Sequence, residues 1–442
     1  MASEIKNQTL RDPVFRFLKV VHRNGLSLRE VSNGNGNGDG TPGKPLTQVA
    51  AAERADLSRP SVAAYVKRMR ETILLEDSIA IRADAGYAIG VDISETRGAR
   101  VALSDISGKI IATEVFGGDE DAYLQRQTPG EALDFVEGAI RRLLDNRDGP
   151  PIDREQIIGV VVSLPGPVKG GNVIGPEAGI WRHLSAADEL SRRLGWEEVP
   201  FATQSDSYLS ALAENHWTGG QVAQDCLFVK WAARLRVAIV IDGKVHVGHS
   251  GSAGELPHQT VKELAEEPRV MPGQIPPPWP PPALEREGLL EACPVCNQVY
   301  CLHMVAPLQS ISMALTGRPG KKGRPDARAS YLVELAEADP EARQILAIAA
   351  RAIGTAVSPL VDALDPEAVV IGGALGSRAF PLVFEAFTSS IGGGPRSIGG
   401  GAMGTESVSV RGGRLEERTA VRGAIALALL DFAPAYLRKL AG

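Results

Sequence analysis

The 442-residue sequence predicts an α/β protein whose body has two lobes and is preceded by a small helical domain. Two separated blocks, 87–116 and 226–255, each read as three strands joined by tight turns, with helical stretches between them. Residues 1–72 carry 12 Lys and Arg against 7 Asp and Glu, whereas the remainder carries 35 against 46. The N-terminal part therefore has a net charge of +5 and the remainder −11, which is typical of a chain whose N-terminal end binds DNA. A basic leader without a partner is the alternative.

The composition excludes several classes of protein. Apolar content of 44% and charged content of 23% are ordinary for folded soluble proteins. The sequence has no run of about 18 apolar residues, so we expect no membrane span. Its first residues lack the positive head and apolar run of a signal peptide. Four cysteines, three of them clustered, do not resemble a secreted disulfide scaffold. We therefore expect a cytoplasmic protein.

The N-terminal residues predict three helices. The first covers 12–25 and is expected to stop at Gly25. Its apolar face consists of Val14, Phe17, Leu18 and Val21. A loop at 32–45 follows, which is too rich in Gly and Asn to pack. Thr47 can cap the second helix and Ser58 the third, which carries Pro60 in its first turn.

The second and third of these helices form a helix-turn-helix pattern around the turn ADLS at 55–58. In this motif the second helix of the pair enters the major groove, and its N-terminal residues reach base edges. Three residues of that helix recur at apolar spacing and are expected to face inward: Val62, Val66 and Met69. The candidate DNA contacts are Ser58, Arg59, Ser61, Val62, Tyr65 and Arg68. Apolar and polar residues alternate over 73–90, which predicts a β-wing. A plain helical hairpin with a basic face is the alternative.

The body carries a set of motifs besides its strand blocks. They are GVDIS-x-T at 90–96, VSLPGPV at 162–168, SDSYLSALAE at 205–214, IDGKVHVGHSGSAGELPH at 241–258 and DPEAVVIGGALG at 365–376. Together with the cysteine cluster CPVCNQVYCLH, these stretches resemble the ROK family of repressors and sugar kinases. The N-terminal LSRPSV resembles the DNA-binding module of the repressor branch of that family.

The resemblance implies an actin-like and hexokinase-like (ribonuclease H-like) fold with a winged helix-turn-helix at its N-terminus. We expect a DNA-binding domain at 1–86, an N-lobe at 87–204 and a C-lobe at 205–442, whose final helix packs back on the N-lobe. A proline-rich stretch at 266–287 is expected to be a surface insertion with polyproline II structure.

Two glycine turns that bind ATP phosphates in ROK kinases are altered. The first is normally Asp-x-Gly-Gly-Thr, but DISET at 92–96 has Ser94 and Glu95 in place of both glycines. The second is normally Gly-Thr-Gly-x-Gly, but AARLR at 232–236 has no glycine. Side chains at these turns keep backbone N–H groups away from phosphate, so the sequence predicts no kinase activity.

The sugar side of the family site is better preserved. The resemblance assigns Asp206 to the position of the catalytic base, here vestigial, beside Ser205 in place of the usual Asn. Glu255 and His258 match a Glu-x-x-His pair, and His303 replaces a family glutamate. These five residues are the candidate ligand-binding set for a sugar or sugar phosphate. The alternatives are a helix N-cap for Asp206 and a solvated loop for Glu255.

The spacing Cys293-x2-Cys296-x4-Cys301-x-His303 could by itself form a three-Cys, one-His zinc site. The ROK resemblance implies a different fourth ligand, His258, so that a structural Zn²⁺ would brace the loop that carries the Glu-x-x-His pair. A redox-active cysteine pair is the other possibility.

These observations favour a ROK-type transcriptional regulator, with repression as the expected direction. It would bind an inverted-repeat operator as a homodimer or tetramer and respond to a sugar or sugar-phosphate effector. One alternative is an active sugar kinase with an accessory DNA-binding module. The other is a regulator that no longer binds sugar and responds to a protein partner.

Overall fold

The computed structural model describes residues 12–30, 46–70, 73–75, 80–93, 99–116, 128–145, 150–175, 180–182, 184–217, 223–260, 293, 296–298, 301–316, 328–391, 408–415 and 419–441. The loop expected at 32–45 and the proline-rich insertion expected at 266–287 lie outside the described residues. The same holds for Ser94 and Glu95 of the first altered turn.

The contacts of the chain divide it into two compact units. Unit 1 comprises Met1–Val222 and Ala420–Gly442, and unit 2 comprises Ala223–Thr419. The division therefore falls at 222/223 rather than at the expected 204/205. The reason is that helix α7 (Asp206–Trp217) packs on strands of the first unit.

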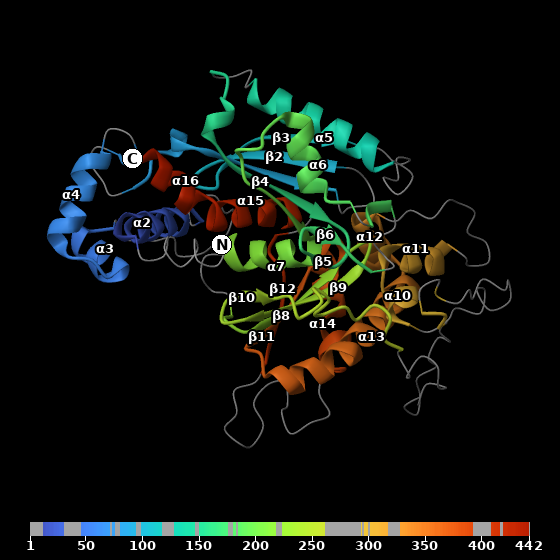
Figure 1. Ribbon diagram of the computed structural model, residues 1–442. Coiled ribbons are helices and arrows are strands. Elements are labelled where there is room, and N and C mark those ends of the chain that lie inside the picture. Colours follow the sequence, from blue (N-terminus) through green and yellow to red (C-terminus); the bar gives the residue numbers. More distant parts are fainter. Residues whose placement is uncertain are drawn as a thin grey trace, which may run out of the picture. The chain divides into compact units, whose positions relative to one another are not determined.

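Unit 1 is built on a five-stranded sheet with the order β3-β2-β1-β4-β7 (Figure 1). Strands β1 (Tyr87–Asp92), β2 (Ala99–Asp105) and β3 (Ile110–Phe116) form an antiparallel meander, which confirms the first predicted block. Strands β4 (Ile157–Leu164) and β7 (Phe201–Ser205) extend the sheet in parallel from β1.

Helices cover both faces of this sheet. Because successive side chains of a strand point to opposite faces, Ile89 and Val91 pack against one helical layer and Ala88 against the other. The first layer consists of α5 (Pro129–Leu144) and α6 (Ala186–Leu194). The second consists of α7 with the C-terminal helices α15 (Thr419–Asp431) and α16 (Ala433–Leu440).

Among the described residues, three N-terminal α-helices precede the sheet: α2 (Pro13–Glu30), α3 (Gln48–Ala55) and α4 (Arg59–Met69). Helix α2 continues through Gly25, the expected stop, because a single glycine costs a helix only about 1 kcal/mol. Both predicted N-caps are confirmed. Thr47 Oγ1 accepts from Ala50 N at 3.1 Å, and Ser58 Oγ accepts from Ser61 N at 3.2 Å.

Helix α2 joins this domain to the rest of unit 1. Its apolar face shares one hydrophobic cluster with α15, α16 and the sheet. The residues of that face, Val14, Phe17, Leu18 and Val21, are all buried. Arg438 of α16 donates to Asp12 at 2.6 Å, and Asp12 also accepts from Val14 N at 2.8 Å. Burial raises the pKa of Asp12, but these hydrogen bonds bring it below its ordinary value. The carboxylate therefore stays charged at neutral pH and holds the two helices together.

Unit 2 is built on a second five-stranded sheet with the order β10-β9-β8-β11-β12. Strands β8 (Cys226–Trp231), β9 (Leu235–Ile241) and β10 (Lys244–His246) form an antiparallel meander. Strands β11 (Ala368–Gly372) and β12 (Ser409–Gly412) extend it in parallel. This order repeats that of the first sheet strand for strand, which confirms the predicted duplication.

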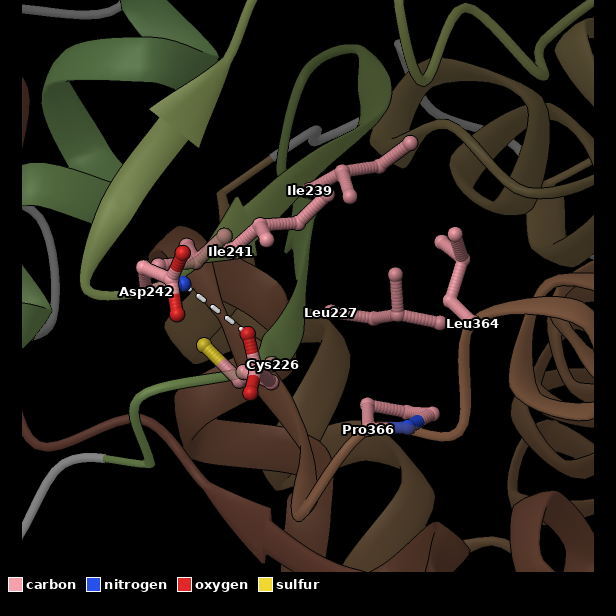
Figure 2. Close-up of a pocket in the computed structure, with 9 residues that line it drawn as sticks. Cys226, Leu227, Ile239, Ile241, Asp242, Leu364 and Pro366 are labelled. Carbon is pink, nitrogen blue, oxygen red and sulfur yellow. Dashed lines mark hydrogen bonds between the residues drawn. The ribbon is translucent and has the colours of Figure 1, made fainter.

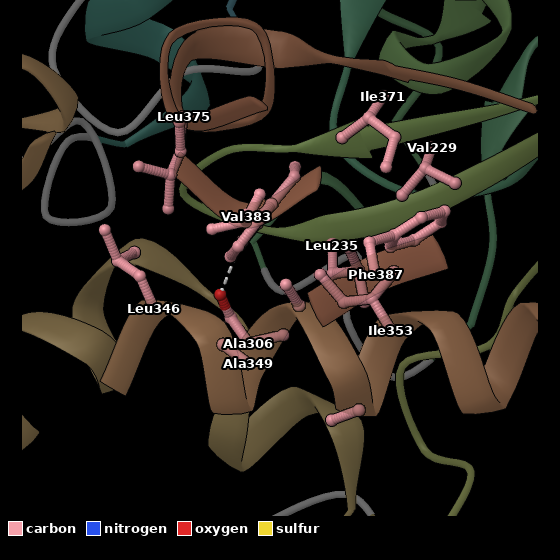
Figure 3. Close-up of a cluster of buried hydrophobic side chains, with 14 of the residues drawn as sticks. Val229, Leu235, Ala306, Leu346, Ala349, Ile353, Ile371, Leu375, Val383 and Phe387 are labelled. Atoms are coloured by element: carbon pink, nitrogen blue, oxygen red, sulfur yellow. Dashed lines mark hydrogen bonds between the residues drawn. The ribbon is translucent and has the colours of Figure 1, made fainter. Parts of the chain in front are cut away.

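One face of the second sheet packs against helices. The helices are α10 (Leu302–Val305), α11 (Leu308–Thr316), α12 (Ala329–Ala338), α13 (Pro340–Leu364) and α14 (Gly373–Thr388). In Figure 3 the apolar residues of α13 and α14 meet below the sheet residues Val229 and Ile371. By length and composition α13, or the bent pair α15–α16, could span a membrane. Both instead contribute buried residues to the hydrophobic clusters of the two units.

Candidate functional site

The outward face of α4 carries exposed positive charge. Arg59, Lys67 and Arg68 are exposed on this helix, and Ala64 is exposed between them. The buried residues Val62, Val66 and Met69 lie on the opposite side and pack against α2 and α3. Helix α4 therefore presents exposed basic side chains near both of its ends that could contact DNA phosphates.

The expected contact set needs one correction. Val62 has 0% of its surface exposed, so it is a core residue and cannot touch DNA. Tyr65 is half-buried, with its ring 5.8 Å from that of Phe17 and the Arg68 guanidinium 5.9 Å from its centroid. Ser58 and Ser61 are committed to the N-cap of α4, where their hydroxyl oxygens lie 2.7 Å apart.

The wing expected at 73–90 is short in the described residues. Leu74 and Ile81 form one antiparallel bridge, supported by hydrogen bonds from Leu75 N to Ala80 O and from Arg82 N to Ile73 O. Residues from Tyr87 onward belong to β1 of the body sheet. The bridged segments 73–75 and 80–82 come after α4 in the chain, as a wing does in winged helix-turn-helix domains.

Polar side chains gather at one edge of the first sheet, where its parallel strands end. Asp92 ends β1, Ser205 ends β7 and Asp206 begins α7. All three are buried, and Asp206 is only 2% exposed. Ser205 Oγ accepts from Tyr208 N at 3.3 Å and Asp206 Oδ1 accepts from Ser207 N at 2.9 Å. Ser205 thus caps the helix, which leaves Asp206 a buried carboxylate rather than the expected alternative of a simple N-cap. Ligands of open α/β sheets bind at such carboxyl ends.

The second altered turn lies between β8 and β9. Ala232 N donates to Arg234 O at 3.2 Å, and no residue of 232–236 is among the described residues with positive φ. A phosphate-binding backbone nest needs successive right- and left-handed residues. The described turn has no such alternation. Arg236, the last residue of this segment, is 1% exposed and forms an ion pair with Glu255.

Four residues of unit 2 bring their metal-binding atoms together. One ring nitrogen of His258 and the sulfur atoms of Cys293, Cys296 and Cys301 all lie within 4.8 Å of one another. His258 Nδ1 is 3.5 Å from Cys293 Sγ. Burial, followed by the neighbouring thiols, raises the pKa of Cys301 to about 12. A bound cation would instead favour the thiolate. None of the four cysteines is in a disulfide.

His303 lies beside this group rather than in it. Its ring centroid is 5.3 Å from that of His258, and its backbone N donates to Pro257 O at 2.5 Å. Geometry therefore groups the three cysteines with His258, the more distant histidine in sequence.

One surface hollow of unit 2 contains none of the predicted site residues. It encloses about 260 Å³ where β8 begins and β9 ends (Figure 2). Cys226, Leu227 and Leu364 line its apolar side, and Asp242 N donates to Asp225 Oδ1 at 2.9 Å on its rim.

Comparison with known protein families matches residues 88–430 to the ROK family. The chain belongs to the ROK family. The resemblance of its sequence motifs is thereby confirmed over most of the body.

Two curated ROK relatives are repressors or regulators by name. The DNA-binding transcriptional dual regulator NagC of Escherichia coli is 21% identical over 376 residues, covering 78% of this chain and 81% of NagC. The xylose repressor of Bacillus subtilis is 19% identical over 259 residues, covering 55% of this chain and 62% of the repressor. Proteins named glucokinase also match.

A solved structure extends the likeness to the whole fold. The ROK family transcriptional regulator described as a homolog of the E. coli MLC protein aligns with a TM-score of 0.65 and 16% identity. The alignment covers 96% of this chain and 99% of that one. The predicted two-lobed ROK fold is therefore confirmed.

Sequence reasoning missed two features of the site. Lys67 and Ala64 belong to the outward face of α4. The helical spacing of the buried residues on the other side of the helix is enough to predict this position. The ion pair between Arg236 and Glu255 had no such signal, because 19 residues separate the partners.

The two histidines give a direct test of the cluster. We expect His258→Ala to lose most of the metal that the purified protein carries, because it removes one of four convergent ligands. His303→Ala should keep it. Elemental analysis of both variants measures this, and metal loss confined to His303→Ala would contradict the geometry.

Proposed function

We propose that this chain is a DNA-binding transcriptional regulator of the ROK family, with repression as the expected direction. The observation that carries the proposal is the exposed basic face of α4 on a helix-turn-helix that is packed into the body of unit 1. Regulators and repressors among its relatives support this reading. The partner is double-stranded DNA in the cytoplasm, bound as an inverted repeat by a homodimer or tetramer.

The proposed effector is a sugar or a sugar derivative. Asp206 and Ser205 lie at the carboxyl edge of the first sheet, where a buried carboxylate could accept a hydrogen bond from a sugar hydroxyl. The other residues of the predicted ligand-binding set, Glu255, His258 and His303, belong to unit 2, where the rings of the two histidines lie 5.3 Å apart. A regulator that no longer binds sugar and responds to a protein partner is the alternative. A thermal-shift series in which no sugar or sugar phosphate stabilises the protein would favour that alternative.

We propose Zn²⁺ as the metal and a structural role for it. In a tetrahedral site with Zn–S bonds of about 2.3 Å, sulfur atoms lie about 3.8 Å apart. The 4.8 Å limit on the four ligand atoms is compatible with that spacing after a small adjustment. His258, Cys293, Cys296 and Cys301 would hold the ion, which would supply a cross-link between the loop at 247–260 and the segment at 293–301.

Phosphoryl transfer is not part of the proposed function. The β8–β9 turn has side chains and no left-handed residue where phosphate-binding backbone would be needed. Glucokinases among the relatives make an active kinase the competing reading.

The DNA-binding surface can be tested by salt dependence. Arg59→Ala and Lys67→Ala should each weaken binding to a 40-base-pair duplex of random sequence and lower the slope of log affinity against log salt by about one. Lys109→Ala, an exposed lysine in the β2–β3 turn, is the matched control and should change neither quantity. Fluorescence anisotropy at several salt concentrations measures both. If the two helix variants bind like the control, α4 is not the DNA-binding helix.

Kinase activity can be tested separately. An ATP-coupled assay with D-glucose, D-xylose and N-acetyl-D-glucosamine should give no turnover above that of Asp206→Asn, because the phosphate turn is lost. Turnover that Asp206→Asn abolishes would establish the kinase reading instead.

A further inference from the structure

The Arg236–Glu255 ion pair involves the loop that also carries His258 of the candidate metal cluster. Arg236 is in β9, on the strand face opposite to the core residues Leu235 and Val237. Its side chain is 1% exposed, and that of Glu255 is 24% exposed. A guanidinium buried to this degree keeps its charge, so it requires a partner of opposite charge, and Glu255 supplies one.

The loop that carries Glu255 is also attached to β9 by its backbone. Val237 N donates to Gly254 O at 3.3 Å, one residue along from the ion pair. Gly254 has φ of +81°, and a Cβ there would lie 1.9 Å from Val237 O. Only glycine allows the two backbones to approach this closely, so the loop packs directly on β9 at Gly254, the residue before Glu255.

Three residues after Glu255 the same loop supplies His258 to the metal cluster. Beyond His258 the loop is tied to the cysteine segment by a hydrogen bond from Leu302 N to Gln259 O at 3.0 Å and by the bridge between Thr260 and Cys301. The loop thus has two attachments, one to β9 through Arg236 and one to the cysteine segment. His258 lies between them.

We propose that Arg236 is a positioning residue for the metal cluster: its ion pair with Glu255 fixes the loop at 247–260 so that His258 faces the three cysteines. The inference rests on the metal site of the proposed function and adds a residue to it. Arg236 belongs to the segment that replaces the second phosphate turn. The residue at the end of this altered segment therefore also contacts the loop that supplies His258.

The first readout is zinc affinity. Arg236→Met removes the charge and leaves Glu255 without this partner, so zinc affinity should fall by about 10- to 100-fold, the range typical when support for a metal ligand is lost. Arg236→Lys should lose less, because it keeps the charge but not the planar fork. Arg343→Met is the matched control: Arg343 donates to Ala336 O and Glu337 O elsewhere in unit 2, and its replacement should leave the affinity within about twofold of the parent. Competition with a chromogenic chelator for Zn²⁺ alone measures these affinities.

The second readout separates the inference from the metal site itself. In metal-free protein, amide hydrogen exchange at 247–260 should be faster in Arg236→Met than in the parent and unchanged in Arg343→Met. The double variant Arg236→Met/Glu255→Gln should recover part of the lost zinc affinity, because no uncompensated charge remains. If the parent protein binds no zinc, the proposed metal site is contradicted. If, in addition, amide hydrogen exchange at 247–260 is the same in Arg236→Met as in the parent, the inference about Arg236 is rejected as well. If Arg236→Met binds zinc like the parent and its loop exchanges like the parent, Arg236 does not position the cluster.

Discussion

The packing of α2 into the core of unit 1 is the interaction on which the proposed function depends. Phe17, Leu18 and Val21 are fully buried in a cluster that also contains residues of the sheet and the C-terminal helices. His22 Nε2 donates to Ile106 O at 3.2 Å, so the helix also has a polar contact with the end of β2. A DNA-binding helix on a flexible tether could not report a change in the body. Here α4 packs on α2, and α2 packs on the same helices as the sheet whose edge carries Asp206. Any rearrangement of that core would move α4.

Unit 2 keeps the architecture of the family fold around a turn that lacks the backbone of a phosphate nest. Its sheet keeps the strand order of the first unit, and its helical core is closed around α13. In the second altered turn, Arg236 lies on the strand face opposite to the core and forms an ion pair with Glu255. The replacement of a glycine by arginine at this position is thus accompanied by a contact to the loop that carries Glu255.

Much of this fold could be predicted from the sequence because its signals are local. The strand blocks, the caps Thr47 and Ser58 and the inward face of α4 all follow from periodicity and capping chemistry. Three features differ from the prediction, for different reasons. Helix α2 runs past Gly25, because one glycine weakens a helix too little to end it. Helix α7 joins unit 1 rather than unit 2, which depends on tertiary packing. Val62 is buried and not a DNA contact, and the helical period of α4 is sufficient to place it in the core. At the site, the family pattern indicated His258, but no local pattern could pair Arg236 with Glu255.

The central claim is that this ROK protein reads a specific DNA sequence through α4. The most direct measurement is selection of bound sequences from a random duplex library by the full chain, followed by sequencing. We expect enrichment of an inverted repeat whose half-site centres lie about 10 base pairs, or a multiple of that, apart. The same selection with an Arg59→Ala/Lys67→Ala protein should give no enrichment. If the parent protein enriches no sequence, or if the double variant enriches the same one, the account is contradicted.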